Sequence, residues 1–353
     1  MKYFYFCIII LIAACQSAPL PQQEKKNEIN LEIDITSQVS PVNTSIRGIS
    51  ILDSNIIWLS GAKGTILRTS NGGVSWEKLN PPDQDSLDFR DVEAFSENSA
   101  LITSAGYPSR VYKTIDGGIS WSLVHENLDS AAFMNSIAFK NQNEGIILGD
   151  QLGGRHLILK TNDQGETWTR IDSNSLPKPL KIENGFAASG SCIAIDGAGN
   201  YFIGLGGEAI RVFSSKDGEN WQATTTPMNS KSSSFGVYSI AHGNGITIGV
   251  GGDYLTPDSS HFGILYDSNE WQLTKGAVNG YRSVIDYSDK GKFWVCGGTN
   301  GLDLSLDDGE TWKTISVENI NTLQFIPNSN SAITATAKGE IFLLSIKTRF
   351  KKD

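Results

Sequence analysis

Three arginines occupy equivalent places in three short phrases of this 353-residue chain, each directly after a large apolar or aromatic residue. Arg47 lies in SIRGIS, Arg90 in DFRDVE and Arg282 in GYRSVI. A guanidinium group binds a carboxylate or a phosphate through two parallel hydrogen bonds. Arginines that repeat in this way would capture an anionic group if the fold brings them to one place.

The same phrase recurs along the chain and gives seven equivalent positions, all polar where their neighbours are apolar. They are Arg47, Arg90, Asn135, Ser191, Tyr238, Arg282 and Asn321. We expect these residues to form a ring at one mouth of a central channel. A second interpretation stays open, in which the arginines only satisfy water and nearby carboxylates. The carboxylates in question are Asp91, Asp150 and Asp253.

A second phrase, which ends in tryptophan, sets the period of the chain. Its copies run from TSNGGVSW (69–76) to SLDDGETW (305–312), and the tryptophans are separated by 45, 47, 53, 50 and 41 residues. Radial or solenoidal architectures have periods of this size. The tryptophans are Trp76, Trp121, Trp168, Trp221, Trp271 and Trp312.

One unit of the repeat, residues 44–79, divides into four short strands. TSIRGISI, IIWLSG, TILRTS and VSWEKL are separated by turns rich in glycine and asparagine. Four such antiparallel strands form one propeller blade. The first strand of each blade lines the channel, so the seven polar positions belong to it. The tryptophan phrase spans the turn between the third and fourth strands and lies on the opposite face.

The two ends of the chain complete each other. After Trp312 only three strands follow (NTLQFIP, SAITATA and EIFLLSI), whereas NLEIDITS (30–37) is an extra strand before the first unit. Open sheet edges are avoided in ring-shaped folds. The sequence therefore predicts an all-β, seven-bladed β-propeller of four-stranded antiparallel blades, closed by the N-terminal strand. Six blades is the alternative if the terminal fragments do not pair.

The tryptophan phrase resembles the Asp-box, or BNR repeat, of pattern S/T-x-D-x-G-x-x-W. Lys216 replaces the acid in the fourth copy, and only Trp271 remains of the fifth. We interpret the acid as an acceptor for backbone N–H groups and the indole as a packing group. These structural positions are Asn71, Trp76, Asp116, Trp121, Asp163, Trp168, Trp221, Asp307 and Trp312.

With seven blades and phrases such as TSNGGVSW, the chain is similar to the photosystem II assembly and stability factor family. That resemblance implies a non-enzymatic module for binding or assembly. Sialidases resemble it more distantly and imply a glycoside hydrolase as the alternative, with an arginine clamp and Tyr238 as nucleophile. However, neither Arg90 nor Arg282 is followed by the Ile-Pro of that family. The interpretation leans away from an enzyme, and no catalytic residue is assigned.

Residues 1–15 carry a lysine, an apolar run and small residues before Cys15. This segment resembles a bacterial lipoprotein signal peptide, which implies acylation of Cys15 and a lipid anchor in the cell envelope. Gln16 implies sorting to the outer membrane. We expect a flexible tether over 16–30, the propeller over 31–347 and a C-terminal tail over 348–353.

Composition limits the possible partners. The net charge of −9 argues against nucleic acid and against direct membrane binding beyond the anchor. GLGGEA (204–209) continues into a strand rather than a helix, so no dinucleotide cofactor is expected, and the four histidines show no metal-binding spacing. Cys192 and Cys296 lie in apolar patterns and are expected to be buried free thiols. We expect a monomer that binds a protein, an anionic small molecule or a glycan.

Overall fold

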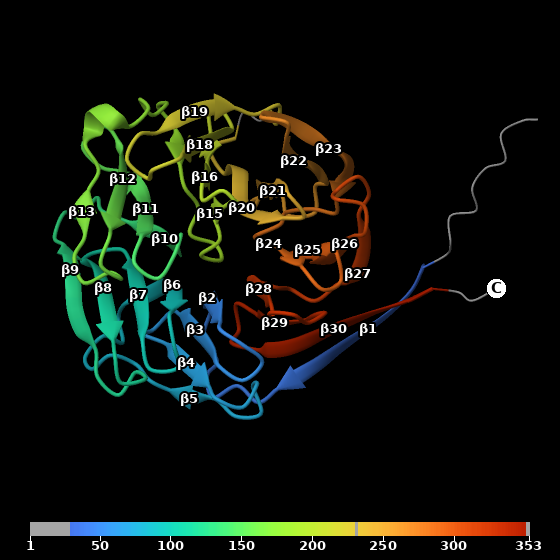
Figure 1. Ribbon diagram of the computed structural model, residues 1–353, viewed down its shortest axis with the longest axis horizontal. Helices are drawn as coiled ribbons and strands as arrows, with labels where there is room; N and C mark the ends of the chain where they lie inside the picture. Colours follow the sequence, from blue (N-terminus) through green and yellow to red (C-terminus); the bar gives the residue numbers. More distant parts are fainter. Residues whose placement is uncertain (1–28, 230–231, 351–353) are drawn as a thin grey trace, which may run out of the picture.

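The computed structural model describes residues 29–229 and 232–350. The expected signal peptide, Cys15 and most of the expected tether lie outside these residues. Seven antiparallel sheets surround a central axis (Figure 1), which confirms the seven-bladed all-β prediction over six blades. The only helical element described is a single 3-10 turn, Ser173–Ser175. No described helix has the length and apolar character that a membrane span requires.

Blades 1 to 4 follow the order of the sequence. Blade 1 contains β2 (Ile46–Ile51), β3 (Ile57–Gly61), β4 (Ile66–Thr69) and β5 (Glu77–Lys78). Blade 2 contains β6 (Asp88–Ala94), β7 (Ala100–Ala105), β8 (Ser109–Thr114) and β9 (Ser122–Asn127). Blade 3 contains β10 (Met134–Phe139), β11 (Gly145–Gln151), β12 (His156–Thr161) and β13 (Thr169–Arg170). Blade 4 contains β15 (Ile193–Ile195), β16 (Tyr201–Gly204), β18 (Arg211–Ser215) and β19 (Gln222–Thr225).

Blade 5 is extended by two short strands from the preceding segment. Its own strands are β20 (Phe235–Gly243), β21 (Ile246–Asp253), β22 (His261–Asp267) and β23 (Glu270–Val278). The added strands, β14 (Glu183–Asn184) and β17 (Gly206–Gly207), bring the sheet to six. Blade 6 contains β24 (Val284–Ser288), β25 (Phe293–Gly298), β26 (Gly301–Ser305) and β27 (Lys313–Ser316).

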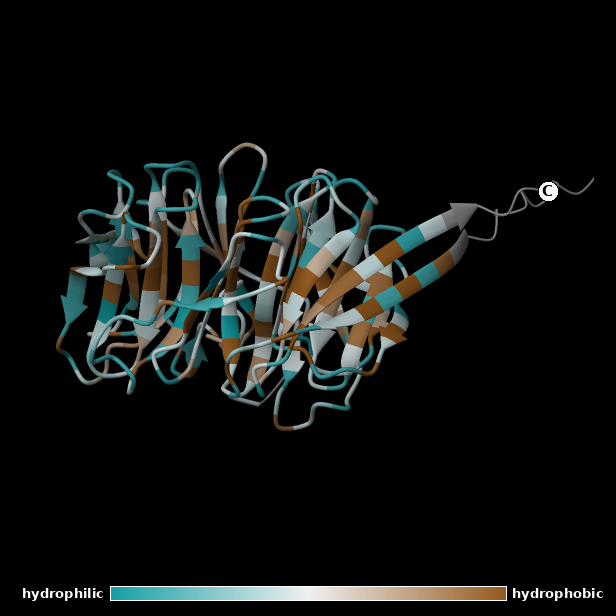
Figure 2. Ribbon diagram, turned by 90° about the horizontal axis from the view of Figure 1, so that it is seen from below, coloured by the Kyte–Doolittle hydropathy of each residue, from teal (hydrophilic) through white to brown (hydrophobic). Residues whose placement is uncertain are grey.

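The two ends of the chain share blade 7. Its strands are β28 (Thr322–Phe325), β29 (Ser331–Ala335), β30 (Ile341–Phe350) and β1 (Ile29–Gln38). β1 pairs antiparallel with β30 from Ile29↔Phe350 to Gln38↔Ile341, so the N-terminal strand closes the ring as predicted. The pair begins and ends slightly beyond the expected 31–347 boundaries, and it projects past the body of the ring (Figure 2).

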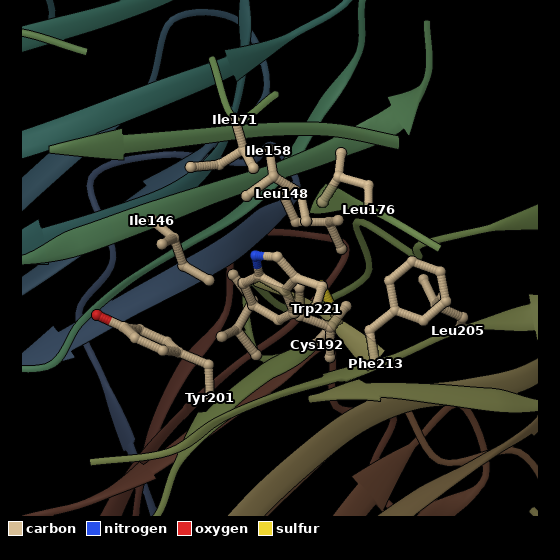
Figure 3. Packing of buried hydrophobic residues seen from close by; sticks show 12 residues of the cluster. Ile146, Leu148, Ile158, Ile171, Leu176, Cys192, Tyr201, Leu205, Phe213 and Trp221 are labelled. Carbon is tan, nitrogen blue, oxygen red and sulfur yellow. The ribbon is translucent and has the colours of Figure 1, made fainter. Parts of the chain in front are cut away.

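The hydrophobic core is divided among the seven blade interfaces. Each of the seven clusters of buried apolar residues joins two consecutive blades. Figure 3 shows the cluster between blades 3 and 4, where Trp221 packs with Ile146 of blade 3 and Phe213 of blade 4. Cys192 and Cys296 are buried free thiols, as expected, and burial raises the pKa of Cys192 to about 12.

Each full Asp-box forms a closed hydrogen-bonded turn. In blade 2, Asp116 Oδ1 accepts the Ser120 amide at 2.9 Å, and the Thr114 hydroxyl accepts the Gly118 amide at 2.8 Å. The Ser120 hydroxyl and amide hold the pKa of Asp116 below its usual value. Asn71, Asp163 and Asp307 make the equivalent amide contact in their copies.

The fourth copy requires a correction. Asp217, not Lys216, occupies the position of the acid, because its Oδ1 accepts the Asn220 amide at 2.8 Å and the Ser215 hydroxyl at 3.0 Å. The turn from acid to amide spans three residues here and four in the other copies. The fifth copy has become a tight hairpin turn at Ser268 and Asn269, both with positive φ.

Candidate binding site at the arginine face

The turns between second and third strands lie on one face of the ring, which we call the arginine face. Arg47 lies in β2 and Arg90 in β6, each at a shift in the pairing register with the next strand, so the two come from neighbouring blades. Burial and the positive charge of Arg47 lower the pKa of Arg90. Arg90 Nη2 pairs with Asp88 at 2.8 Å, and its guanidinium carbon lies 5.6 Å from the centre of the Phe133 ring.

Arg47 is the less compensated of the two charges. Its Nη1 lies 3.5 Å from the Ala188 carbonyl oxygen. Among the described residues, no carboxylate oxygen lies within 4.0 Å of its guanidinium nitrogens, although ion pairs with that spacing occur at ten other places. The residue is partly exposed, although its Nε is buried without a hydrogen-bond partner among the described residues. Two neighbouring guanidinium groups with one carboxylate between them leave an excess of positive charge that suits an incoming anion.

Arg282 does not join this pair. Its side chain has no exposed surface, and its Nε and Nη2 donate to Asp303 Oδ2 at 3.0 and 2.7 Å. Nη1 donates to Asn300 at 2.5 Å. Because Asp303 and Asn300 of blade 6 hold the guanidinium of Arg282, its side chain turns into blade 6 instead of lining the channel. The expected convergence of three arginines is therefore reduced to two.

A loop that the repeat pattern did not indicate closes the channel beneath Arg47 and Arg90. We call the segment Phe186–Ser191 the plug; it lies near the axis in Figure 1. The carbonyl oxygens of Ala187 and Ala188 accept from Arg90 and Arg47. Ser189 donates to the Ser283 carbonyl of blade 6 at 2.7 Å, and Ser191 shares a 2.6 Å contact with Ser239 of blade 5.

Gly190 fixes the depth of the plug. Its carbonyl accepts from Ser136 of blade 3, and its φ of +73° is a conformation that favours glycine. A Cβ at this position would overlap the Asp91 carboxylate of blade 2. Asp91 is itself buried and accepts the Ile137 amide at 2.8 Å, and burial raises its pKa.

The other ring positions have hydrogen-bond partners within the protein. Asn135 is buried and donates to Asp150 at 2.9 Å. Asn321 of blade 7 donates to the Ile46 carbonyl of blade 1 at 3.0 Å. Ser191 lies in the plug, because the first strand of blade 4 begins only at Ile193. These partners account for the polarity of Asn321 and Ser191 without a ligand, whereas the buried Asn135 Oδ1 has no hydrogen-bond partner among the described residues.

Tyr238 belongs to an aromatic cluster. Its ring stacks on Phe186 at 3.8 Å between centroids and meets Tyr281 edge-on at 4.8 Å. Its hydroxyl donates to the Ser234 carbonyl at 2.6 Å, and burial raises its pKa. Asp253 accepts from Ser234 at 2.7 Å and from the Leu255 amide at 2.9 Å.

Exposed apolar side chains border the arginine face. Tyr107, Tyr254 and Leu255 lie in turns between second and third strands and are 63%, 53% and 67% exposed. Tyr254 also reaches the edge of the Tyr238 ring, at 6.5 Å between centroids. A face that combines arginine with exposed aromatic rings has the composition enriched at protein interfaces.

Below the plug, the channel holds a cavity of about 240 Å³. Glu93, Asp286, His242 and Gln324 contribute to its wall, and the plug forms its ceiling. The poorly solvated wall raises the pKa of Glu93 to about 8 and that of Asp286 to about 6. Within the part of the chain that the structure describes, no three acidic, histidine or cysteine side chains are placed to hold a metal ion.

The plug is the functional feature that sequence reasoning missed. The available signal was the interval of 53 residues between Trp168 and Trp221, the longest of the five. The extra residues include NGFAASGS (184–191), a run of small side chains with no strand alternation. Small residues suit the crowded axis of the ring.

Comparison with known proteins agrees with this architecture. Residues 105–200 match the family described as photosynthesis system II assembly factor YCF48. A photosystem II assembly lipoprotein Ycf48 of Synechococcus sp. (strain CC9902) is 24% identical over 325 residues, 88% of this chain and 86% of the relative. The Ycf48 lipoprotein of Picosynechococcus sp. (strain ATCC 27264 / PCC 7002 / PR-6) is 25% identical over 328 residues, 89% of this chain and 85% of the relative.

Two solved structures share the fold. YCF48 bound to a D1 peptide superimposes with a TM-score of 0.63 at 17% identity, over 91% of this chain and 97% of that one. YCF48 from Cyanidioschyzon merolae gives 0.63 at 16% identity, over 88% and 98%. At these identities the likeness concerns the fold alone. The chain is a BNR-type propeller similar to the photosystem II assembly factor family.

Proposed function

We propose that this protein is a non-enzymatic binding propeller whose arginine face recognises an acidic segment of a protein partner. The observation that carries the proposal is the pair Arg47 and Arg90, of which only Arg90 has a carboxylate partner among the described residues. An incoming carboxylate would reduce the repulsion between the two guanidinium groups and add charge-assisted hydrogen bonds.

The surroundings of the pair favour a peptide over a small anion. Tyr107, Tyr254 and Leu255 offer exposed apolar surface on the same face, and the plug closes the channel, so a ligand rests on the face instead of entering it. The similar YCF48 structure holds a D1 peptide, which supports a protein as the class of partner. A small anionic molecule or glycan would use the arginines without the apolar border.

The site gives little support to the alternative of a sialidase-like hydrolase. The Tyr238 hydroxyl donates to a backbone carbonyl within an aromatic cluster, and its raised pKa disfavours a phenolate nucleophile. Arg282 is engaged by Asp303 and has no exposed surface to clamp a carboxylate. Asp91 is buried below the plug, and Asp150 and Asp253 belong to different blades.

For the location, we propose the cell envelope with a lipid anchor at Cys15 and sorting to the outer membrane. The residues 12–15, IAAC, support it, as does Gln16. Both relatives are named lipoproteins. Incorporation of labelled palmitate into the wild-type protein but not into Cys15→Ala, with density fractionation of the membranes, tests both parts.

The binding role is tested with a labelled peptide of alternating glutamate and phenylalanine and its glutamine counterpart. We expect fluorescence anisotropy to show binding of the first only, weakened about tenfold or more by Arg47→Ala with Arg90→Ala. Arg155→Ala, a partly exposed arginine of blade 3 that donates to the carbonyl oxygens of Gly154 and Ser173, is the matched control. Equal binding of both peptides, or no effect of the arginine substitutions, would overturn the proposal.

A further inference from the structure

On the face opposite the arginines, which we call the Asp-box face, neighbouring blades are tied by a repeated contact. Lys113 of blade 2 reaches Glu166 in the Asp-box turn of blade 3 at 2.6 Å. Lys160 of blade 3 reaches Glu219 in the turn of blade 4 at 2.7 Å. In both cases the lysine also donates to a carbonyl oxygen of the same turn, that of Gln164 or Asp217. The tie therefore consists of a lysine in the third strand and an Asp-box turn in the next blade.

Both halves of this tie are missing between blades 4 and 5. Lys113 and Lys160 directly precede the residues whose hydroxyls bind the Asp-box acid, Thr114 and Thr161. In blade 4 the equivalent position is Ser214, which precedes Ser215. In blade 5 the Asp-box turn is replaced by the tight turn at Ser268 and Asn269. The short side chain of Ser214 in blade 4 thus faces the short turn at Ser268 and Asn269 in blade 5.

The space left by these two losses is a groove of about 400 Å³, within the size range of small-molecule sites. Its floor is aromatic: Tyr266 of blade 5 lies 5.1 Å from Phe202 of blade 4 and 4.9 Å from Trp271. The groove between blades 3 and 4, of about 380 Å³, is lined by Lys160, Arg170, Asp163 and Glu219 and has no aromatic residue. The aromatic floor is therefore a particular property of the blade 4–5 groove.

The walls of this groove carry amides. Asn200, Asn220, Gln222 and Asn269 line it, together with Ser214. An amide both donates and accepts hydrogen bonds, as a sugar hydroxyl does. The Nδ2 groups of Asn200 and Asn220 already donate to Asp196 and Asp217, so these two asparagines offer a ligand their carbonyl oxygens. The charged residues of the wall are Lys216 and two carboxylates, Asp196 and Asp217, which are already engaged by turn amides. The wall therefore carries no large excess of either charge.

We propose that the groove between blades 4 and 5 binds a neutral carbohydrate. The apolar C–H face of a pyranose would pack on Tyr266, whose ring is amphipathic, while its hydroxyls would exchange hydrogen bonds with Gln222 and the asparagines. This site goes beyond the proposed peptide-binding role, because it lies on the opposite face and uses none of the same residues.

The test is saturation-transfer NMR and calorimetry on the purified protein with glucose, galactose, mannose, N-acetylglucosamine and N-acetylgalactosamine. We expect at least one of them to bind and the binding to be lost in Ser214→Lys, which restores the long cationic side chain. Gln222→Ala, at an exposed position, should weaken binding at least fivefold, and Tyr266→Ala should abolish it. Ser37→Lys adds the same charge to an exposed site on blade 7 and should change nothing.

Two results would overturn the proposal. One is the absence of saturation transfer from every sugar of the panel. The other is binding that survives Ser214→Lys and Gln222→Ala, because it would place the sugar elsewhere. Tyr266 also packs on Phe202 and Trp271, so the result for Tyr266→Ala counts only if its thermal midpoint equals that of the wild type. If the midpoint falls, Ser214→Lys and Gln222→Ala decide the test.

Discussion

Arg90 Nη1 donates a 2.8 Å hydrogen bond to the carbonyl oxygen of Ala187, a residue of the plug 97 positions later in the chain. This bond joins the arginine face to the plug, and the neighbouring Arg47 approaches the next carbonyl, that of Ala188. The two side chains that we propose for peptide recognition thus also contact the plug.

The plug is expected to contribute to stability through Gly190. Gly190→Ala forces a methyl group against the Asp91 carboxylate and should lower the free energy of unfolding by about 3 kcal/mol. Gly153→Ala is the matched control, since its φ of +65° is similar but a Cβ there meets nothing within 4 Å; it should cost about 1 kcal/mol. Equal losses in urea denaturation would show that the plug is not tightly packed.

Arg282 is expected to act in folding, not in binding. Asp303→Ala leaves its guanidinium buried without a counter-charge and should cost about 3–5 kcal/mol. Arg47→Ala, at a partly exposed position, should stay within about 0.5 kcal/mol of the wild type. Denaturant titrations of the two variants provide the comparison. If Asp303→Ala lowers the free energy of unfolding only slightly, Arg282 does not depend on Asp303 and is available to bind a ligand.

The assignment of the fourth Asp-box is testable by two adjacent substitutions. Asp217→Ala removes the acceptor of the Asn220 amide and should destabilise the protein by about 1 kcal/mol. Lys216→Ala should leave the thermal midpoint unchanged. If Lys216→Ala destabilises the protein and Asp217→Ala does not, then Lys216 occupies the position of the acid.

The channel should make stability depend on pH through Glu93. An unfolded glutamate has a pKa of about 4.3, whereas the folded value is about 8, so the folded state holds the proton more tightly. The contribution of Glu93 to stability is therefore complete below about pH 4 and is lost as the pH rises through about 8. Thermal midpoints of Glu93→Gln should exceed those of the wild type at pH 9, with a smaller gain at pH 5. Exposed Glu97→Gln serves as control, and a gain independent of pH contradicts the interpretation.

Closure by the N-terminal strand predicts a sharp difference between two truncations. Removal of residues 1–28 leaves β1 paired with β30, and the protein should remain a monomer with an unchanged thermal midpoint. Removal of residues 1–38 exposes the edge of β30 and the apolar partners of Leu31, Ile33 and Ile35. Light scattering after gel filtration should then show association.

The sequence allowed the fold to be predicted because its signals are local. The period of the tryptophan phrase and the alternation within each strand are readable without tertiary contacts, and the two incomplete ends indicated the closure. The sequence could not show where the Arg282 side chain points, because this depends on a tertiary contact with Asp303 in the third strand of the same blade. The fourth Asp-box was misaligned because counting back from Trp221 assumes a constant turn length. The plug has no periodicity at all.

The plug contacts first strands or their flanking residues from six other blades, the sixth through the Thr322 hydroxyl of blade 7, so it interrupts the channel. The lower cavity of the ring is a blind recess, and any solute that enters from below must leave by the same opening. The two faces of the molecule can therefore engage different molecules at once, with no passage of material from one to the other.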